Sequence, residues 1–182
     1  MQFIRTEIPE VVIIEPEVFE DSRGFFMETY QARIYTQAGI DFTFVQDNHS
    51  RSTQFTLRGL HYQIRHAQGK LVRVVAGKIF DVAVDIRRSS LSFGKSINLI
   101  LSAQNKRQLW IPAGFAHGIY VVSEWAELLY KTTDYYDPGA ERTIIWNDPT
   151  LKVPWPIKPG EIPTLSPKDR AGTLLSEAET YE

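Results

Sequence analysis

The sequence has no cysteine in any of its 182 residues. This absence excludes a disulfide framework and a metal site built on thiolates, and it suits a protein of the cytoplasm. An excess of positive charge is also absent, since 20 Lys and Arg residues stand against 22 Asp and Glu residues, for a formal net charge of -2. We therefore expect no basic surface for nucleic acid, although a small anionic ligand needs only a few local cations.

Long hydrophobic runs are missing as well. The amino-terminal stretch MQFIRTEIPEVVIIEPEVF interrupts its apolar residues with Glu and Pro, so it resembles neither a signal peptide nor a membrane span. The chain also lacks a long amphipathic repeat and a Gly-rich dinucleotide-binding motif. These absences predict a cytoplasmic protein with no membrane partner and no nicotinamide cofactor.

The sequence does contain many short β-branched and aromatic runs between turn signals. With 43% hydrophobic and 12% aromatic residues, the chain can bury one core, and we expect a single domain over residues 1–182. Besides a pair of strands within Leu57–Val74, the runs predicted as strands are VVII, FTFVQ, LVRVVAG, IFDVAVDI, INLIL, LWIPAG, IYVV, ELLYKTTDYY and RTIIWND. These pieces are too short and too regularly spaced for alternating β-α units, so an all-β sandwich, jelly roll or barrel is expected.

Two segments fall outside the strand pattern. QARIYTQAG, after Tyr30, is predicted to be a short surface helix. From about residue 148 the stretch NDPTLKVPWPIKPGEIPTLSPKD is dense in proline. Because proline cannot donate to a β-ladder, we expect this stretch to be an extended tail that lies over the domain.

The segment Pro112–His117, with the sequence PAGFAH, resembles the second motif of the cupin barrels. In that motif a proline-glycine turn leads into a strand whose histidine points into the barrel. The first cupin motif supplies two histidines separated by one residue, then a glutamate, then six residues and a glycine, and these side chains help to bind a metal. The resemblance narrows the expected fold to an antiparallel jelly roll of the cupin type with short peripheral helices.

The first cupin motif is altered in this chain. Gln63 stands where the second histidine after His61 is expected, and Lys70, with six residues between it and Gly77, takes the place of the glutamate. An ammonium group cannot bind a divalent cation and would repel it. A metal site made of His61 and His117 alone is therefore not expected, and a metal-dependent cupin oxygenase or isomerase is the less favoured interpretation.

A lysine in such a cavity can replace a metal as the group that stabilises a developing oxyanion. Deprotonation next to a ketone needs a base, a cation at the enolate oxygen and, for inversion, an acid on the opposite face. His61 is the candidate base and Lys70 the candidate oxyanion partner. Tyr130 is the candidate acid, because it lies two residues after Leu128 on a predicted strand and faces the same side.

Longer motifs follow one another along nearly the whole chain. They lie in Phe19–Glu28, Gln46–Asn48, Leu57–His61, Gln68–Val74, Asp81–Asp85, Trp110–Gly118, Tyr130–Tyr136, Glu141–Arg142, Trp146–Pro149 and Ser166–Asp169. In these motifs the chain resembles the dTDP-4-dehydrorhamnose 3,5-epimerase family, metal-free cupin-like isomerases of nucleotide-sugar metabolism. The resemblance implies epimerisation at C3 and C5 of dTDP-4-dehydro-6-deoxy-D-glucose to dTDP-4-dehydro-L-rhamnose, in dTDP-L-rhamnose biosynthesis, without a cofactor.

The resemblance also implies a role for each residue of the reaction site. His61 would be the proton acceptor, held by the carboxylate of Asp169, and Tyr130 the proton donor. Lys70 would stabilise the enolate at the sugar ketone, with His117 beside it.

The remaining implied residues bind the substrate. Arg23 and Arg58 would bind the diphosphate, whose oxygens suit the planar guanidinium fork, and Tyr136 would stack on the thymine ring. Further substrate contacts are implied for Phe26, Glu28, Gln46, Asn48, His117, Glu141 and Lys168. The family is dimeric with exchange of amino-terminal strands, so we expect a homodimer in which Arg23 and Glu28 act on the partner's site.

Two other functions remain open. Related enzymes epimerise only C3 or only C5 of similar dTDP sugars with the same base and acid, so a monofunctional epimerase is the first alternative. A cupin-like module that binds a nucleotide sugar without turnover is the second, and it would be marked by the loss of His61 or Tyr130. Both residues are present.

Some polar and aromatic residues are interpreted as structural. Asp81 and Asp85 face the same side of a strand, but they would lie about 13 Å apart, too far for a pair of catalytic carboxylates. Tyr135 and Tyr136 would face opposite sides of a strand, so one of them is expected in the core. His49 and His66 match no motif and are expected on the surface or in loops.

Overall fold

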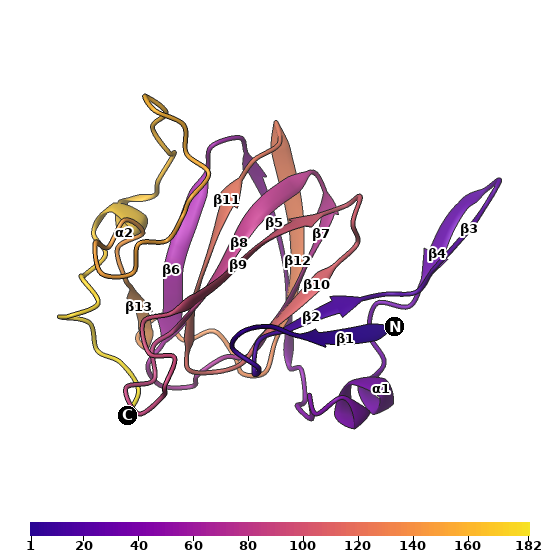
Figure 1. The fold of residues 1–182 in the computed structure, drawn as a ribbon, viewed down its shortest axis with the longest axis horizontal. Coiled ribbons are helices and arrows are strands. Elements are labelled where there is room, and N and C mark those ends of the chain that lie inside the picture. The colour runs from indigo at the N-terminus through magenta and orange to yellow at the C-terminus, as the bar shows by residue number, and fades with distance from the viewer.

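Two antiparallel sheets face each other in the computed structural model, which describes residues 1–182 (Figure 1). The first sheet has the strand order β1 (Gln2–Arg5), β2 (Val12–Glu15), β10 (Gln108–Ile111), β7 (Lys70–Ala76), β12 (Trp125–Thr132) and β5 (Gln46–Thr53). The second sheet has the order β13 (Glu141–Thr143), β6 (Leu57–Gln63), β11 (Phe115–Val121), β8 (Lys78–Asp85) and β9 (Ser96–Ser102). This arrangement confirms the predicted all-β jelly roll of the cupin type.

The main core lies between the two sheets, where apolar side chains of both inner faces meet. Val72 and Leu128 of the first sheet pack in one cluster with Ala83 and Ile119 of the second. A further cluster lies on the outer face of the second sheet. Strand β8 is therefore buried along almost its whole length, which explains why its sequence IFDVAVD is apolar on both faces instead of alternating.

The strands predicted from the sequence differ from those of the structure mainly where the residues are polar. Strand β5, with the sequence QDNHSRST, has no apolar alternation, so its pattern did not predict a strand. In FTFVQ only Gln46 belongs to a strand, and Phe44 instead packs edge-on against Trp110. The predicted helix after Tyr30 is confirmed as α1 (Ala32–Gln37). Neither this helix nor α2 (Pro167–Arg170) is long and apolar enough to cross a membrane.

The proline-rich segment lies over the second sheet. Leu151, Leu175 and Ala178 pack in one cluster with strands β6, β8 and β11. Thr164 forms a parallel bridge with Thr56, just before β6. The extended segment thus covers the outer face of the sheet, as expected. It also contains helix α2, which was not predicted from its proline-rich sequence.

A two-stranded hairpin, β3 (Val18–Asp21) and β4 (Gly24–Met27), projects away from both sheets (Figure 1). Its aromatic side chains are exposed, with 57% of Phe19, 58% of Phe25 and 70% of Phe26 open to solvent. The hairpin leaves these three phenylalanines unburied, so it has no core of its own. An isolated two-stranded ribbon of this kind is only marginally stable.

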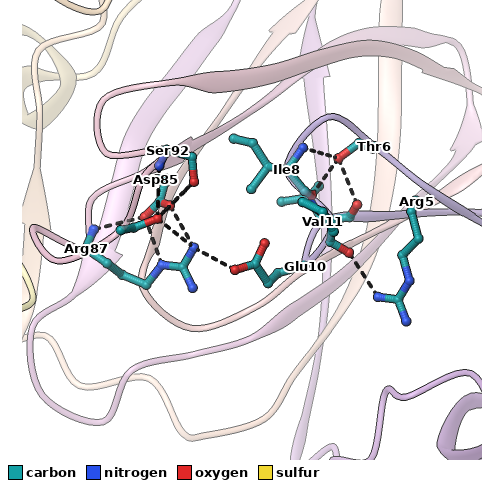
Figure 2. A network of polar contacts seen from close by, with 10 residues as sticks. Arg5, Thr6, Ile8, Glu10, Val11, Asp85, Arg87 and Ser92 are labelled. Atoms are coloured by element: carbon teal, nitrogen blue, oxygen red, sulfur yellow. Dashed lines mark hydrogen bonds and ion pairs between the residues drawn. The ribbon is translucent and has the colours of Figure 1, made fainter.

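A buried carboxylate anchors the loop that follows β8 (Figure 2). Asp85 has no exposed surface, and its oxygens accept hydrogen bonds from Arg87, Ser90 and Ser92. The Arg87 guanidinium also lies 3.2 Å from the Glu10 carboxylate of the amino-terminal segment. The structure thus agrees with the structural interpretation of Asp85.

Candidate active site

A cavity of about 390 Å³ is lined by side chains from both sheets. Its lining residues are Gln46, Asn48, Ser50, Arg58, His61, Gln68, Lys70, His117, Gly118, Ile119, Leu128, Tyr130, Tyr136, Glu141 and Lys168. Leu128 and Tyr130 both face this cavity, so the parity predicted for the two residues on β12 is confirmed. The cavity therefore brings together most of the residues predicted for the site.

His61 and Asp169 form a close pair at the cavity wall. Nε2 of His61 lies 2.7 Å from Oδ1 of Asp169. Nε2 is buried, and its close contact with the carboxylate is not an aligned hydrogen bond. Burial lowers the pKa of the His61 imidazole, and the neighbouring Asp169 carboxylate only partly opposes this effect. The ring is therefore neutral at physiological pH and can accept a proton.

Asp169 is oriented by the turn that begins helix α2. Ser166 is the N-cap residue, Pro167 is at the first helical position, and Asp169 completes a capping box with Ser166. The Gly59 amide donates a hydrogen bond of 3.0 Å to Oδ1 of Asp169. Burial alone would raise the pKa of this carboxyl, but the contacts from His61, Ser166 and Gly59 together lower it, so the group stays ionised.

The close approach of Gly59 requires glycine. Its φ angle is +135°, and a Cβ atom built there would lie 2.5 Å from Cα of Gly118 on the neighbouring strand β11. A larger residue would push the two strands apart. Since Gly59 lies two residues before His61, this contact helps to set the position of the base.

His117 is the cross-strand neighbour of His61 in the pairing of β11 with β6. Its Nε2 lies 3.0 Å from each carboxylate oxygen of Asp81, which has no exposed surface. The structural interpretation of Asp81 is therefore incomplete, because Asp81 holds a residue that lines the cavity. An aspartate inside the apolar strand β8 was the available signal, since a buried carboxylate needs a partner.

Lys70, at the start of β7, directs its charge into the cavity. Its side chain lines the cavity, and its ammonium group has no hydrogen-bond or ion-pair partner in the protein. Burial lowers the pKa of its ammonium group to about 8, while Glu141 and Asp81 partly oppose the shift. An unpaired ammonium in this position is prepared to bind a negative charge that develops on a ligand.

Tyr130 lies across the cavity from the two histidines. It belongs to β12 of the first sheet, whereas His61 and His117 belong to the second sheet. Burial raises the pKa of its phenol, which therefore stays protonated at physiological pH. A base and a protonated acid on opposite walls can act on opposite faces of one ligand.

At one side of the cavity, two predicted substrate contacts, Glu141 and Lys168, form a hydrogen-bonded cluster with Tyr136. The Tyr136 hydroxyl donates a hydrogen bond of 2.9 Å to Glu141, and Lys168 donates one of 2.7 Å to the other oxygen of the same carboxylate. Arg58 of strand β6 donates a hydrogen bond to the hydroxyl of Ser52 in β5. Tyr135 and Tyr136 lie in a loop and are 65% and 51% exposed, so the prediction that one of them is in the core was wrong.

Three predicted substrate contacts do not reach this cavity within the chain. The Arg23 side chain is 88% exposed and pairs with Asp21 in the β3–β4 hairpin. Phe26 is exposed in the same hairpin, and Glu28, just after it, accepts a hydrogen bond from Gln31. The hairpin projects away from the sheets that form the cavity (Figure 1).

The altered cupin motif can also be followed in the structure. His61, Lys70 and His117 line the cavity, whereas Gln63 does not. No three side chains of His, Cys, Asp or Glu lie together in a way that could hold a metal ion. The donor set therefore does not fit the metal of the cupin motif, since its glutamate position carries an ammonium group.

The chain is similar to proteins of one family over almost its whole length. The sequence model described as dTDP-4-dehydrorhamnose 3,5-epimerase matches residues 5–177. A protein of that name from Pseudomonas aeruginosa is 57% identical over 182 residues, which are 100% of this chain and 99% of the relative.

Solved structures agree with the sequence comparison. The dTDP-6-deoxy-D-glucose-3,5-epimerase of Legionella pneumophila, in complex with dTDP-4-keto-L-rhamnose, superposes with a TM-score of 0.95 at 54% identity, covering 98% of this chain and 94% of the other. A 3'-monoepimerase from Streptomyces bikiniensis, in complex with dTDP-quinovose, superposes with a TM-score of 0.88 at 30% identity, covering 94% and 87%.

Proposed function

The chain belongs to the dTDP-4-dehydrorhamnose 3,5-epimerase family, and on that premise we propose how its residues carry out the reaction. The protein is an isomerase that acts on a dTDP-linked 4-keto-6-deoxy sugar in dTDP-rhamnose biosynthesis. The substrate is dTDP-4-dehydro-6-deoxy-D-glucose, and inversion at C3 and C5 converts it to dTDP-4-dehydro-L-rhamnose. The cavity with its histidine, lysine and tyrosine is the observation that supports this assignment.

His61 is the base of the proposed mechanism. Because Asp169 occupies Nε2, the other ring nitrogen, Nδ1, takes the proton from the carbon next to the ketone. The electron pair of the broken C–H bond moves into an enolate whose negative charge is on the C4 oxygen. Asp169 then stabilises the imidazolium that forms, as a buried carboxylate does beside other catalytic histidines.

Lys70 and His117 stabilise the enolate oxygen. The C4 ketone acidifies both C3 and C5, and both enolates place their charge on the same oxygen, so one cation can serve two inversions in turn. The unpaired ammonium of Lys70 supplies this charge. The reaction returns a proton for each one that it removes and transfers no electrons, so it balances without a cofactor.

Tyr130 is the proposed acid. It donates its phenolic proton to the face of the carbon opposite the face from which His61 took one, and configuration inverts. The positions of the two residues on opposite sheets support this role. The tyrosinate and the imidazolium exchange protons with solvent after each inversion, so that His61 is again a base and Tyr130 again an acid for the second carbon.

The nucleotide end of the substrate has its own contacts in the proposal. Arg58 and Arg23 bind the diphosphate, and Tyr136 stacks on the thymine ring. The other substrate contacts are Phe26, Glu28, Gln46, Asn48, His117, Glu141 and Lys168. Of these groups, the ones on the hairpin and just after it are supplied by a second chain, in a homodimer that exchanges amino-terminal segments. The three exposed phenylalanines of the hairpin support this arrangement, because a partner would cover them.

The proposal extends to the whole chain. Residues 1–182 form a single domain, in which the proline-rich segment from about residue 148 supplies Asp169 and Lys168 to the site. We assign the protein to the cytoplasm, which suits both the absence of cysteine and its nucleotide-sugar substrate.

The deciding experiment follows deuterium from heavy water into dTDP-4-dehydro-6-deoxy-D-glucose by NMR, without added metal or reductase. The proposal predicts exchange at both C3 and C5. His61→Asn should abolish it, while His66→Asn, a change at an exposed histidine outside the cavity, should leave it intact. Exchange at one carbon would identify a monofunctional epimerase, and binding without exchange would identify a non-catalytic module.

A further inference from the structure

Gln63 is the one altered position of the cupin motif that has no place in the proposed mechanism. It ends strand β6, two residues after His61, and only 4% of its surface is exposed. Its side chain does not line the cavity. A buried amide needs hydrogen-bond partners, and those of Gln63 lie in loops outside the strand.

The main partner of Gln63 is the loop that joins β12 to β13. The Gln63 amide nitrogen donates to the carbonyl oxygen of Tyr135 at 3.1 Å, and its amide oxygen accepts from the backbone N–H of Asp137 at 2.9 Å. The same nitrogen donates to the carbonyl of His66 at 2.7 Å. Gln63 thus holds the backbone on both sides of Tyr136.

Two further glutamines bind the same loop. The backbone N–H of Tyr136 donates to the side-chain oxygen of Gln46 at 3.0 Å. The side-chain nitrogen of Gln68 donates to the carbonyl of Asp134 at 2.9 Å. We name the three side chains Gln46, Gln63 and Gln68 the glutamine clasp. Only Gln63 of the three lies outside the cavity wall.

The loop depends on these hydrogen bonds because it has little apolar packing of its own. Both of its tyrosines are more than half exposed. The loop also connects the strand of the proposed acid, Tyr130, to the strand that pairs with β6, which carries the proposed base. A change in its backbone would first displace Tyr136, the proposed contact of the thymine ring, and leave the anchored strands in place.

We propose that Gln63 is a positioning residue that fixes the Tyr135–Asp137 backbone, so that Tyr136 is preorganised for the nucleotide end of the substrate. This inference rests on the proposed function. In this proposal, the position that binds a metal in the cupin motif contributes instead to substrate affinity. Gln63 acts through Tyr136 and touches neither the substrate nor the reacting carbons.

The test compares Gln63→Met, which keeps the length of the side chain and removes its hydrogen bonds, with the native protein. KM for the dTDP sugar and Kd for dTDP should both rise about tenfold, whereas kcat should change less than about twofold, because one set of buried hydrogen bonds is lost. Gln54→Met is the matched control. Gln54 is exposed and lies outside the cavity, and its side chain donates only to the carbonyl of Val122.

A second background separates positioning from a general structural role. In a Tyr136→Ala protein the ring is already missing, so Gln63→Met should change Kd for dTDP by less than about twofold. Gln63→Glu keeps an acceptor for Asp137 but turns a carboxylate oxygen toward the carbonyl oxygens of His66 and Tyr135, so it should raise Kd at least as much as Gln63→Met. An equal loss in both backgrounds, a fall of kcat with unchanged KM, or failure of both Gln63 variants to fold would overturn the proposal.

The two proposals fail in different ways. A native protein that binds dTDP but exchanges no deuterium contradicts the proposed reaction, and the dTDP affinities still decide the role of Gln63. A native protein that exchanges normally, with the same dTDP affinity in Gln63→Met, contradicts only the role of Gln63.

Discussion

The imidazole of His117 rests on the buried carboxylate of Asp81, with Nε2 3.0 Å from each of the two oxygens. His117 is also the cross-strand partner of His61. The cavity therefore contains two histidines side by side, and each has an aspartate at its Nε2 atom. The carboxylate fixes the orientation of the His117 ring.

Asp81→Asn tests this relationship. The amide keeps the shape of the side chain but replaces one of the two carboxylate oxygens that hold Nε2 of His117, so the ring is held less firmly beside the enolate oxygen. We expect kcat to fall about 10- to 100-fold with little change in KM, the range typical of residues that orient a functional histidine. Steady-state kinetics would measure both values, and an unchanged kcat would show that the contact has no part in the reaction.

Asp85→Asn should have the opposite profile. Burial favours protonation of Asp85, but hydrogen bonds from Arg87, Ser90 and Ser92 outweigh it and lower its pKa to about 2. The stabilisation from this carboxylate is thus present above the ordinary Asp pKa of about 3.9 and is lost as the pH falls through about 2. We expect Asp85→Asn to lower the free energy of unfolding by about 2 kcal/mol at pH 7. Urea unfolding would measure this, and deuterium exchange into the substrate should keep its native rate.

The pH dependence of kcat/KM should be bell-shaped. Burial lowers the pKa of His61, so its basic form is lost only below the ordinary histidine range, and the acid limb should have its midpoint under about 6.5. The Lys70 ammonium, with a pKa of about 8, loses its proton above that pH, and this sets the alkaline limb. Lys70→Arg should move the alkaline limb upward, because a guanidinium stays charged. An alkaline limb that does not move would assign it to another group.

Tyr130→Phe should separate proton removal from inversion. The base and the oxyanion partner remain, so solvent deuterium should still enter the substrate at a reduced rate. Inversion should fall more than the exchange does, because no acid remains on the opposite wall. NMR of the recovered sugar reports both outcomes, and equal losses of exchange and inversion would contradict the donor role.

Mixing two inactive variants can test the exchange of hairpins. Arg23→Ala lacks one proposed phosphate contact, and His61→Asn lacks the base. If the hairpin acts on the partner's site, a heterodimer of the two variants contains one site with both native residues, and mixing after mild denaturation should restore activity. Arg33→Ala, a change at an exposed arginine of α1, is the control that should be active alone. No recovery in a mixture proven to contain heterodimers would place Arg23 on its own chain's site.

The fold was predictable where the sequence pattern reports burial. IFDVAVD and LVRVVA became strands β8 and β7 because their apolar residues enter the core between the sheets. Strand β5 has polar residues throughout and lies at the edge of the first sheet, where pairing with β12 alone decides its conformation. No local pattern carries this information, because β-propensity depends on the neighbouring strand.

The candidate site, too, was predictable only in part. Most of the predicted residues line one cavity. Side-chain chemistry and motif spacing predicted the two histidines, the lysine and Tyr130, whereas the family resemblance implied the other substrate contacts. The contact of Asp81 with His117, and the three glutamines that hold the Tyr135–Asp137 loop, involve ordinary polar residues whose role depends on a partner far away in the chain. Such partners are visible only once the strands are paired.

By itself, the sequence determined the class of fold and the chemistry available, because strand alternation and side-chain type are local properties. It predicted a histidine base, a lysine in place of a metal ligand and a tyrosine acid. The tertiary structure decided which carboxylate holds which histidine. It also decided that the proposed base and the proposed acid face each other from different sheets, and that the hairpin residues lie outside their own chain's cavity. These relationships follow from strand order and register, and these arise from packing contacts between segments that are distant in the sequence.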